Sequence, residues 1–252
     1  MLSHPTHDKL VAMKLLGMAA ALNEQRQMPV CESMSFDERL GLLVDREMTE
    51  RANRQLALRL KTARLRQNAV AEDIDFKQTR GLDRSLVMFL LAGNWIRHHE
   101  NCLITGPTGA GKSYLACALA NKACRDGWKT LYVRSPRLFS ELAIARADGS
   151  YGRRLLAISK IDLLVIDDWG LSPLNQAQAR DLLEILDDRY GKRATIVASQ
   201  SPVETWHPLI GDPVIADAAL DRLVHNAHRI SIKGESMRKT LASLTKQTDT
   251  EP

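Results

Sequence analysis

The sequence predicts an α/β fold in which a parallel sheet is covered by helices and preceded by a small all-helical region. From residue 101 onward, short runs of β-branched and aliphatic residues alternate with amphipathic stretches, a pattern typical of parallel sheets. Before residue 78, apolar residues instead recur at helical spacing. We therefore expect a helical domain over 1–78 that contacts DNA or a partner, an α/β domain over 79–245 and a frayed tail over 246–252.

The helical region contains signals for its first elements. Residues 10–22 form an apolar stretch that Lys14 interrupts, which favours an amphipathic helix over the core of a signal peptide. Further along, Ser35 precedes Glu38 at the spacing of a capping box, which predicts the start of a long helix. The expected apolar stripe of that helix comprises Phe36, Leu40, Val44, Met48, Ala52, Leu56, Leu60 and Ala63.

The α/β domain contains several runs that read as strands. These runs are 101–105, 130–133, 161–167, 194–199 and 229–233, and the clearest helices between them are 113–125 and 177–190. A chain of 252 residues, 44% of them hydrophobic, can fill the core of one sizeable domain and a smaller one. No apolar run approaches the roughly 18 to 20 residues that cross a bilayer, so we expect no membrane partner and a cytoplasmic location.

Residues 106–113 read GPTGAGKS and match the phosphate-binding loop G-x-x-x-x-G-K-[ST] in full. The strand run NCLIT precedes this loop and the helical run YLACALANKAC follows it, which is the context that the motif requires. Glycines let backbone N–H groups turn toward phosphate oxygens at a helix N-terminus, and the lysine adds charge for the β- and γ-phosphates. The expected nucleotide-binding residues are Gly106, Pro107, Thr108, Gly109, Ala110, Gly111, Lys112, Ser113 and Tyr114.

Two adjacent carboxylates, Asp167 and Asp168, end the strand run LLVIDD and predict a metal and hydrolysis site. At the carboxyl end of its strand, Asp167 is expected beside the phosphate-binding loop, where it would hold Mg²⁺ together with the hydroxyl of Ser113. Asp168 is placed to polarise an attacking water, although a surface or helix-cap carboxylate is the alternative interpretation. The expected cofactors are therefore ATP and Mg²⁺, and the expected activity is ATP hydrolysis.

Polar residues later in the chain fit a site that senses the γ-phosphate. Ser199 and Gln200 follow a strand run, and either could orient the water or contact the γ-phosphate. Arg222 lies on an expected helix, where it either pairs with a nearby acid or reaches a neighbouring subunit as an arginine finger. Arg238 could contact the phosphates of its own ATP. Both arginine roles stabilise charge on the transferred phosphoryl group.

Several segments together resemble the AAA+ ATPases of the IstB type, which are helper proteins of insertion-sequence transposons and relatives of the replicative helicase loader DnaC. These segments are GPTGAGKS, LLVIDDWG, the block GDPVIADAALDRLVH over 211–225 and KGESMRK over 233–239. The resemblance covers nearly the whole chain. It implies an AAA+ core of the P-loop NTPase class, with strand order 5-1-4-3-2 and ATP bound between subunits of a homo-oligomer.

The resemblance also implies roles for individual residues. Its Walker B pair is Asp167 and Asp168, its sensor 1 is Ser199 or Gln200, its arginine finger is Arg222 and its sensor 2 is Arg238. Two positions depart from the usual AAA+ pattern. Asp168 replaces the commoner glutamate, which implies slow hydrolysis, and Gln200 replaces the asparagine of many relatives.

Helpers of this kind assemble on target DNA with ATP and recruit or stimulate a transposase, so DNA, a transposase and further copies of the chain are the implied partners. The alternative functions are a DnaC-like helicase loader, a small-molecule kinase with the same loop, and a module that binds ATP without turning it over.

Basic residues gather in two regions, one late in the long helix and one between the second and third strand runs, and the net charge is +5. Unmixed cations repel one another and would be relieved by phosphates, whereas a solvated helix surface is the alternative. With no zinc finger or helix-turn-helix signature, DNA contact would be mainly to the backbone. The candidate DNA contacts are Arg59, Arg64, Arg146, Arg153 and Arg154.

Overall fold

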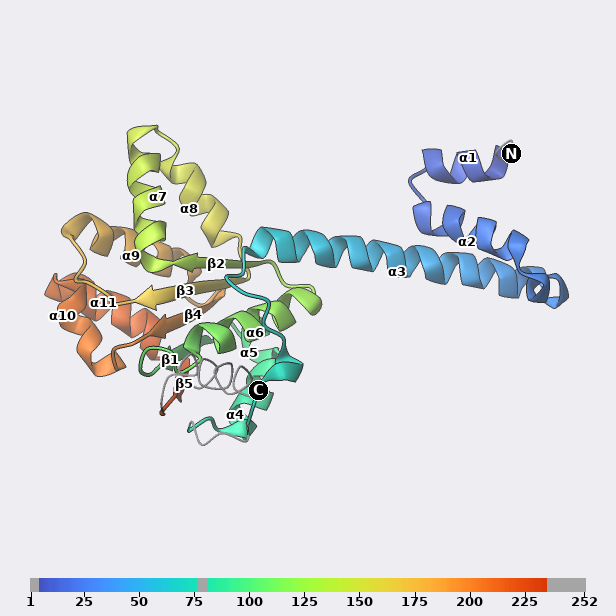
Figure 1. Ribbon diagram of the computed structural model, residues 1–252. Coiled ribbons are helices and arrows are strands. Elements are labelled where there is room, and N and C mark those ends of the chain that lie inside the picture. Colours follow the sequence, from blue (N-terminus) through green and yellow to red (C-terminus); the bar gives the residue numbers. More distant parts are fainter. Residues whose placement is uncertain (1–4, 77–80, 235–252) are drawn as a thin grey trace, which may run out of the picture. The chain divides into compact units, whose positions relative to one another are not determined.

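The computed structural model describes residues 5–76 and 81–234 (Figure 1). The chain divides into two compact units, a first unit over 1–58 and a second unit over 59–252. This division differs from the boundary expected at residue 78, because residues 59–76 pack with the second unit. Ala69 and Ile74, for example, are buried in the same apolar cluster as Leu115. The tail expected over 246–252 lies outside the described residues.

The first unit contains the helices α1 (Pro5–Ala12) and α2 (Leu16–Gln27), the 3₁₀ helix η1 (Pro29–Ser33) and most of α3 (Phe36–Ala63). The single helix expected over 10–22 is wrong, because Lys14 adopts a left-handed conformation with φ of 60°. The N–H of Leu15 donates to the carbonyl of Leu10, and the N–H of Lys14 donates to that of Val11. This pair of hydrogen bonds is a Schellman motif, which ends α1 before α2 begins.

The side chain of Glu47, on α3, forms hydrogen bonds with the start of α2 inside the first unit. Its side chain is 7% exposed, and its carboxylate accepts the N–H groups of Gly17 at 2.7 Å and Met18 at 3.2 Å, at the start of α2. Arg51 donates to the same carboxylate at 2.7 Å. Gly17 makes the approach possible, since a Cβ there would lie 2.7 Å from the Cα of Glu47. The carboxylate therefore satisfies N–H groups that a helix N-terminus leaves without a partner.

The predicted capping box at the start of α3 is confirmed. The N–H of Ser35 donates to the Glu38 carboxylate at 2.8 Å, and the N–H of Glu38 donates to the Ser35 hydroxyl at 3.3 Å. The predicted apolar stripe is only partly buried, because Phe36 is 77% exposed and Met48 is 64% exposed, whereas Ala63 is fully buried. The stripe therefore forms a core only near the end of α3.

The second unit is built on a five-stranded parallel sheet with the order β2-β3-β4-β1-β5 (Figure 1). This order, read from the other edge, is the expected 5-1-4-3-2, so the predicted fold class is confirmed. The last strand begins and ends two residues earlier than expected. The strands are β1 (Asn101–Thr105), β2 (Thr130–Arg134), β3 (Leu163–Trp169), β4 (Ala194–Ser199) and β5 (Ala227–Ser231).

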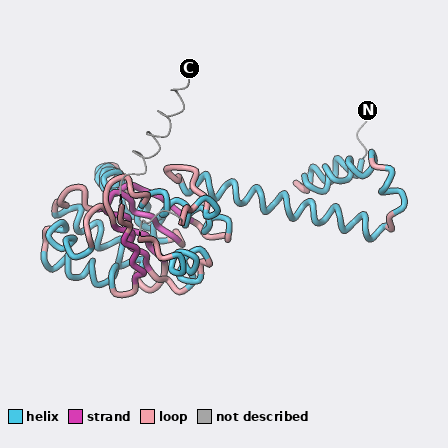
Figure 2. Tube along the Cα trace, turned by 60° about the horizontal axis from the view of Figure 1, so that its bottom comes forward, coloured by secondary structure: helices cyan, strands magenta, loops and turns pink. Residues whose placement is uncertain are grey.

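Helices cover both faces of this sheet, and Figure 2 shows the strands enclosed between them. One buried cluster contains α4 (Arg84–Leu91), α5 (Asn94–Arg97), α6 (Lys112–Arg125) and the turn η2 (Ala71–Asp73). The other contains α7 (Ser135–Ala147), α8 (Tyr151–Ser159), α9 (Gln176–Arg189), η3 (Val203–Thr205), α10 (Trp206–Ile210) and α11 (Pro213–Val224). Within 5–76 and 81–234, no helix combines the length and apolar character that a bilayer crossing requires.

Candidate nucleotide-binding site

The phosphate-binding loop leaves β1 at Gly106 and enters α6 at Lys112, in the strand–loop–helix context that the motif predicts. Gly109 and Gly111 have φ of 83° and 101°, a region that side chains disfavour. Gly106 is needed for a second reason, because a Cβ at this position would lie 2.3 Å from the carbonyl oxygen of Ile232. The loop is thus pressed against the chain that follows β5 while it wraps the N-terminus of α6.

Lys112 turns back over the loop. Its Nζ donates to the carbonyl oxygens of Gly106 at 2.7 Å and Pro107 at 2.9 Å. Burial lowers the pKa of Lys112, and the carboxylates of Asp167 and Asp168 act in the opposite direction. The amine therefore lies over the loop and interacts favourably with the charges of the two carboxylates.

Asp167 lies near the C-terminal end of β3, where both of its carboxylate oxygens accept hydrogen bonds. Its side chain is 2% exposed. The Tyr132 hydroxyl donates to one carboxylate oxygen at 2.5 Å, and the N–H of Asp168 donates to the other at 2.8 Å. Burial, followed by Asp167, raises the pKa of Tyr132, so this phenol remains a donor. Sequence reasoning missed Tyr132, because only the register of β2 beside β3 brings these two residues together.

Asp168 has a left-handed backbone with φ of 56°, where the pairing of β3 with β4 shifts register between Ile166 and Trp169. Aspartate tolerates this conformation better than most side chains. Its carboxylate lies 2.5 Å from the Nε of Arg134 and 3.5 Å from Nη1 of Arg66. Asp168 is therefore part of an ion-paired cluster beside Asp167, which the sequence did not predict.

The two sensor-1 candidates occupy different environments. Ser199 is fully buried; its hydroxyl donates to the carbonyl of Trp169 at 2.9 Å and accepts the N–H of Ser201 at 3.1 Å. Gln200 is exposed, and its side-chain oxygen accepts a hydrogen bond from Thr108 of the phosphate-binding loop at 2.7 Å. Of the two, Gln200 is the residue that the structure brings to the loop.

Arg222 lies at the N-terminal end of the parallel strands, opposite the end at which the phosphate-binding loop of its own chain lies. Its carbonyl accepts a hydrogen bond from Asn101 at the start of β1, whereas the loop follows the end of that strand. Its guanidinium pairs with Asp187 of α9 and donates to the carbonyl of Ala218 at 2.7 Å. Arg222 therefore lies away from the phosphate-binding loop of its own chain. The predicted phosphate contact Arg238 lies outside the described residues.

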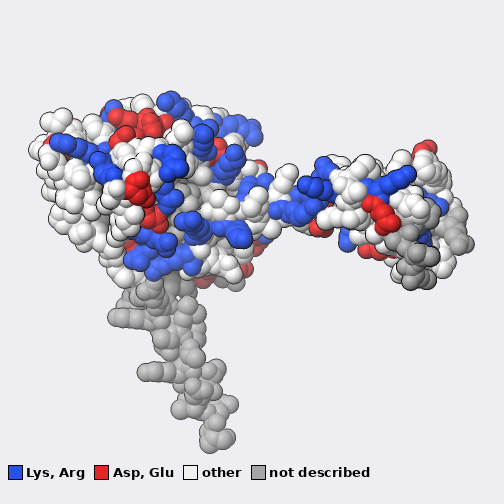
Figure 3. All heavy atoms as spheres, turned by 90° about the horizontal axis from the view of Figure 1, so that it is seen from above, with Lys and Arg blue, Asp and Glu red and all other residues white. Residues whose placement is uncertain are grey.

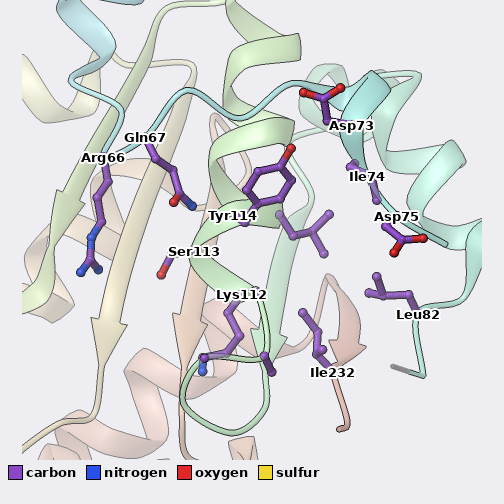
Figure 4. A pocket seen from close by; sticks show the side chains of 14 residues that line it. Arg66, Gln67, Asp73, Ile74, Asp75, Leu82, Lys112, Ser113, Tyr114 and Ile232 are labelled. Carbon is purple, nitrogen blue, oxygen red and sulfur yellow. The ribbon is translucent and has the colours of Figure 1, made fainter. Parts of the chain in front are cut away.

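A cavity of about 380 Å³ adjoins the loop, and Figure 4 shows side chains from residues 66–82, α6 and Ile232 around it. Its volume lies in the range of small-molecule sites. Tyr114, one of the residues expected to bind the nucleotide, borders this cavity. Sequence reasoning missed Asp73, Ile74, Asp75 and Leu82 as residues that line this cavity. The apolar residue Ile74, between acidic neighbours, was the signal that could have revealed them.

The five arginines predicted to contact DNA differ in the interactions that they make within the chain. Arg146 pairs with Asp181 and Arg154 with Glu141, while Arg59 donates to the carbonyl of Cys124 at 2.8 Å. Arg64 and Arg153 are exposed, and neither forms an ion pair within the described part of the chain. Figure 3 shows basic and acidic side chains intermixed on the face of the second unit that carries α7 and α8.

The oxygen ligands at the loop fit a magnesium ion. Ser113 at the start of α6 offers a hydroxyl, and Asp167 offers a carboxylate. Across 5–76 and 81–234, no cluster of three or more His, Cys, Asp or Glu side chains could hold a metal ion. Hydroxyl and carboxylate oxygens of this kind suit Mg²⁺, which is commonly held by one or two carboxylates together with phosphate oxygens and water.

Known structures share the fold of the second unit. The chain resembles a DnaI structure with a TM-score of 0.57 and 23% identity, over 66% of this chain and 92% of that one. It resembles the DnaC helicase loader with a TM-score of 0.56 and 18% identity, over 66% of this chain and 97% of that one. At these identities the likeness concerns the fold alone.

Sequence comparison gives the family. The chain is 56% identical to a protein of Sinorhizobium fredii named as an insertion-sequence ATP-binding protein, over 95% of this chain and 98% of that one. It is 48% identical to a protein of Pseudomonas fluorescens named as the ATP-binding protein of insertion sequence IS1162, over 81% and 89%. The family model described as IstB-like ATP binding protein matches residues 8–245. The chain therefore belongs to the IstB-like ATP binding proteins.

Proposed function

We propose that this protein is an ATPase that assembles on target DNA and recruits or stimulates a transposase. The observation that carries the proposal is the phosphate-binding loop with the Lys112 amine bonded to the carbonyls of Gly106 and Pro107, in a chain of the IstB-like family. Relatives at 48% and 56% identity are named for insertion sequences, which favours transposition over helicase loading. The likeness to DnaC is one of fold and adds no partner.

ATP would bind with its phosphates in the loop and its base in the adjoining cavity. The N–H groups of the loop and the Lys112 amine would contact the phosphates, and the apolar side chains of Ile74, Leu82 and Ile232 would pack against the base. Ser113 and Asp167 would hold Mg²⁺, which supplies charge neutralisation for the β- and γ-phosphates. The hydrogen bonds on both Asp167 oxygens would keep its carboxylate aimed at the loop.

Hydrolysis would use Asp168 as the group that orients and deprotonates water. Its carboxylate pairs with Arg134, so this role requires the ion pair to open. Gln200, which contacts Thr108 of the loop, would orient the same water or contact the γ-phosphate. Arg222 would complete the site of a neighbouring subunit, because it lies at the end of the parallel strands opposite its own loop. A homo-oligomer would thus be the active form.

DNA would be bound through its phosphates. Arg64 and Arg153 are the candidate contacts that the described chain leaves exposed and without an ion pair. Arg146 and Arg154 already have acidic partners and would have to exchange them for phosphates. Contacts of this kind position a protein on the duplex without selecting a sequence.

Lys112→Ala tests the nucleotide site. A fluorescent ATP analogue with Mg²⁺ should bind the wild-type chain, and the variant should lose at least tenfold in affinity, since a hydrogen bond to a charged group contributes about 1.5–3 kcal/mol. The matched control is Lys122→Ala, on the same helix, where the amine pairs with Asp126 at 2.5 Å and not with the loop. Equal affinities for the two variants would overturn the assignment.

The DNA part of the proposal is tested by the wild-type ATPase rate with and without duplex DNA. We expect the rate to rise when DNA is added, and to rise again with the transposase encoded by the same insertion sequence. A rate that neither addition changes would contradict a role as a DNA-dependent helper, even if ATP binds.

A further inference from the structure

Arg66 contacts the two carboxylates that the proposed function assigns to magnesium and water. Its Nη1 lies 3.5 Å from Asp168 and 3.7 Å from Asp167. A hydrogen bond with Tyr132 raises the pKa of Arg66, and the two carboxylates act in the same direction. Figure 4 places the guanidinium on the Ser113 side of the cavity, which Arg66 also lines.

We propose that Arg66 and Mg²⁺ compete for the Asp167 and Asp168 carboxylates, so that Arg66 must leave the pair when magnesium-bound nucleotide is present. This inference rests on the proposed function, because it concerns the same nucleotide site. It makes Arg66 a positioning residue that stabilises the carboxylate pair without metal and weakens the metal site.

The contacts decide which partner moves. The Asp167 side chain is 2% exposed and fixed by hydrogen bonds to both oxygens, whereas the Arg66 side chain is 39% exposed. A guanidinium and a divalent cation repel each other at such separations, and the buried carboxylate cannot turn away from its donors. Arg66 is therefore the group that can swing into solvent.

The position of Arg66 in the chain gives this movement a consequence. α3 ends at Ala63, and the next residue, Arg64, has a left-handed φ of 52°. Ala63 and Ala69 are fully buried, which fixes the backbone on both sides of Arg66. The ion pair thus lies on a short segment, anchored at Ala63 and Ala69, that connects α3 to the nucleotide cavity. Opening of the ion pair would therefore alter the chain at the point where it leaves α3.

The first experiment is a Mg²⁺ titration of nucleotide binding with the full chain. Arg66→Gln should lower the Mg²⁺ concentration at half-maximal binding of a fluorescent ATP analogue by about two- to fivefold, the range expected when a partly exposed ion pair no longer competes. Arg125→Gln is the control, since it removes an equal charge from a partly exposed ion pair with Glu72 that does not include the two aspartates, and should leave the midpoint unchanged. An unchanged or raised midpoint for Arg66→Gln would overturn the proposal, the latter because it would indicate contact with phosphate.

The second experiment uses Mg²⁺ alone and so does not depend on ATP. Millimolar MgCl₂ should raise the thermal midpoint of Arg66→Gln more than that of the wild type, while Arg125→Gln follows the wild type. Arg66→Lys, which keeps the charge, should respond less than Arg66→Gln. Equal responses in all four proteins would refute the competition. Failure of the proposed function is a separate outcome, in which the wild type binds no nucleotide at any Mg²⁺ concentration.

Discussion

The hydroxyl of Thr108 donates a hydrogen bond of 2.7 Å to the side-chain oxygen of Gln200, so the chain that follows β4 touches the phosphate-binding loop. Ser199, its neighbour, is turned the other way and bonds the backbone of Trp169 and Ser201. Adjacent residues after one strand thus have different tasks. Gln200 contacts the phosphate-binding loop, whereas Ser199 satisfies backbone groups at the end of β3 and after β4.

Gln200→Ala should slow ATP turnover by about tenfold or more without changing stability, because in the proposed site it removes the polar group that would contact the γ-phosphate or the attacking water. Ser199→Ala should instead cost about 1–3 kcal/mol of stability, because it leaves buried backbone groups without their partner. Single-turnover hydrolysis and thermal unfolding of both variants check this. The reverse pattern would move sensor 1 to Ser199.

Asp168→Asn should retain nucleotide binding and reduce turnover by about a hundredfold, since it removes the carboxylate that we propose as the general base. Asparagine also tolerates the left-handed backbone at this position, so the fold should be unaffected. ATP affinity, turnover and the melting temperature are the measurements. Wild-type turnover would show that the Asp168 carboxylate serves only its ion pairs with Arg134 and Arg66.

If Arg222 completes the site of a neighbouring subunit as proposed, Arg222→Ala should leave ATP binding intact and reduce hydrolysis in the oligomer. Mixing Arg222→Ala with Asp168→Asn subunits should restore part of the activity, since some interfaces then contain both intact residues. Asp187→Asn separates the alternative. If the Arg222–Asp187 pair is only structural, this variant and Arg222→Ala should be equally destabilised, and mixing should rescue nothing.

Arg153→Ala should reduce the slope of log K against log salt for duplex DNA by about 0.9, the value for one neutralised phosphate. Arg154→Ala is the comparison, because its guanidinium already pairs with Glu141, and we expect a smaller change in slope. The measurement is DNA affinity across a range of salt concentrations. Slopes equal to that of the wild type would make Arg153 an ordinary surface charge.

Acid should loosen α2 from α3 in the first unit. A hydrogen bond from Arg51, with help from the N–H groups of Met18 and Gly17, lowers the pKa of Glu47 against the opposing effect of burial. A carboxylate with a lowered folded-state pKa stabilises the fold above its unfolded pKa of about 4.3, and this stabilisation is lost as pH falls through the folded value.

Hydrogen exchange within α2, corrected for the intrinsic effect of pH, should therefore accelerate below about pH 4 in the wild type. Glu47→Gln should show fast exchange already near neutral pH and little further change. Glu24→Gln is the control, because the ion pair of Glu24 with Arg46 is long, at 3.8 Å, and half-exposed, so it stabilises the unit little. This variant should behave as the wild type does. Identical profiles for all three proteins would contradict the role of Glu47.

The elements predicted most accurately are those whose signal is local. Residues 101–105 and 194–199 become strands at the predicted bounds, because a short apolar run between polar residues depends on few neighbours. The loop motif places Lys112 correctly for the same reason. Lys14 was harder, since a non-glycine residue in a left-handed turn leaves little trace in hydrophobic periodicity.

The parts of the site that escaped prediction depend on contacts between distant segments. The two aspartates meet Tyr132 and Arg134 only after β2 pairs with β3. They meet Arg66 only after residues 59–76 pack against the rest of the second unit. Charge counting along the chain could not show that Arg146 and Arg154 have acidic partners. Sequence spacing reveals a loop that wraps phosphates, whereas pairing across the sheet determines which charges remain free.

The close approach of Ile232 to Gly106 joins the phosphate-binding loop to the edge strand of the sheet. The N–H of Ile232 donates to the carbonyl of Thr105 at 2.8 Å, directly before the loop begins. A Cβ at position 106 would lie 2.3 Å from the carbonyl oxygen of Ile232, so any side chain there would force the loop and the residue after β5 apart. The loop therefore cannot shift at Gly106 without displacing the end of β5, the edge strand beside β1.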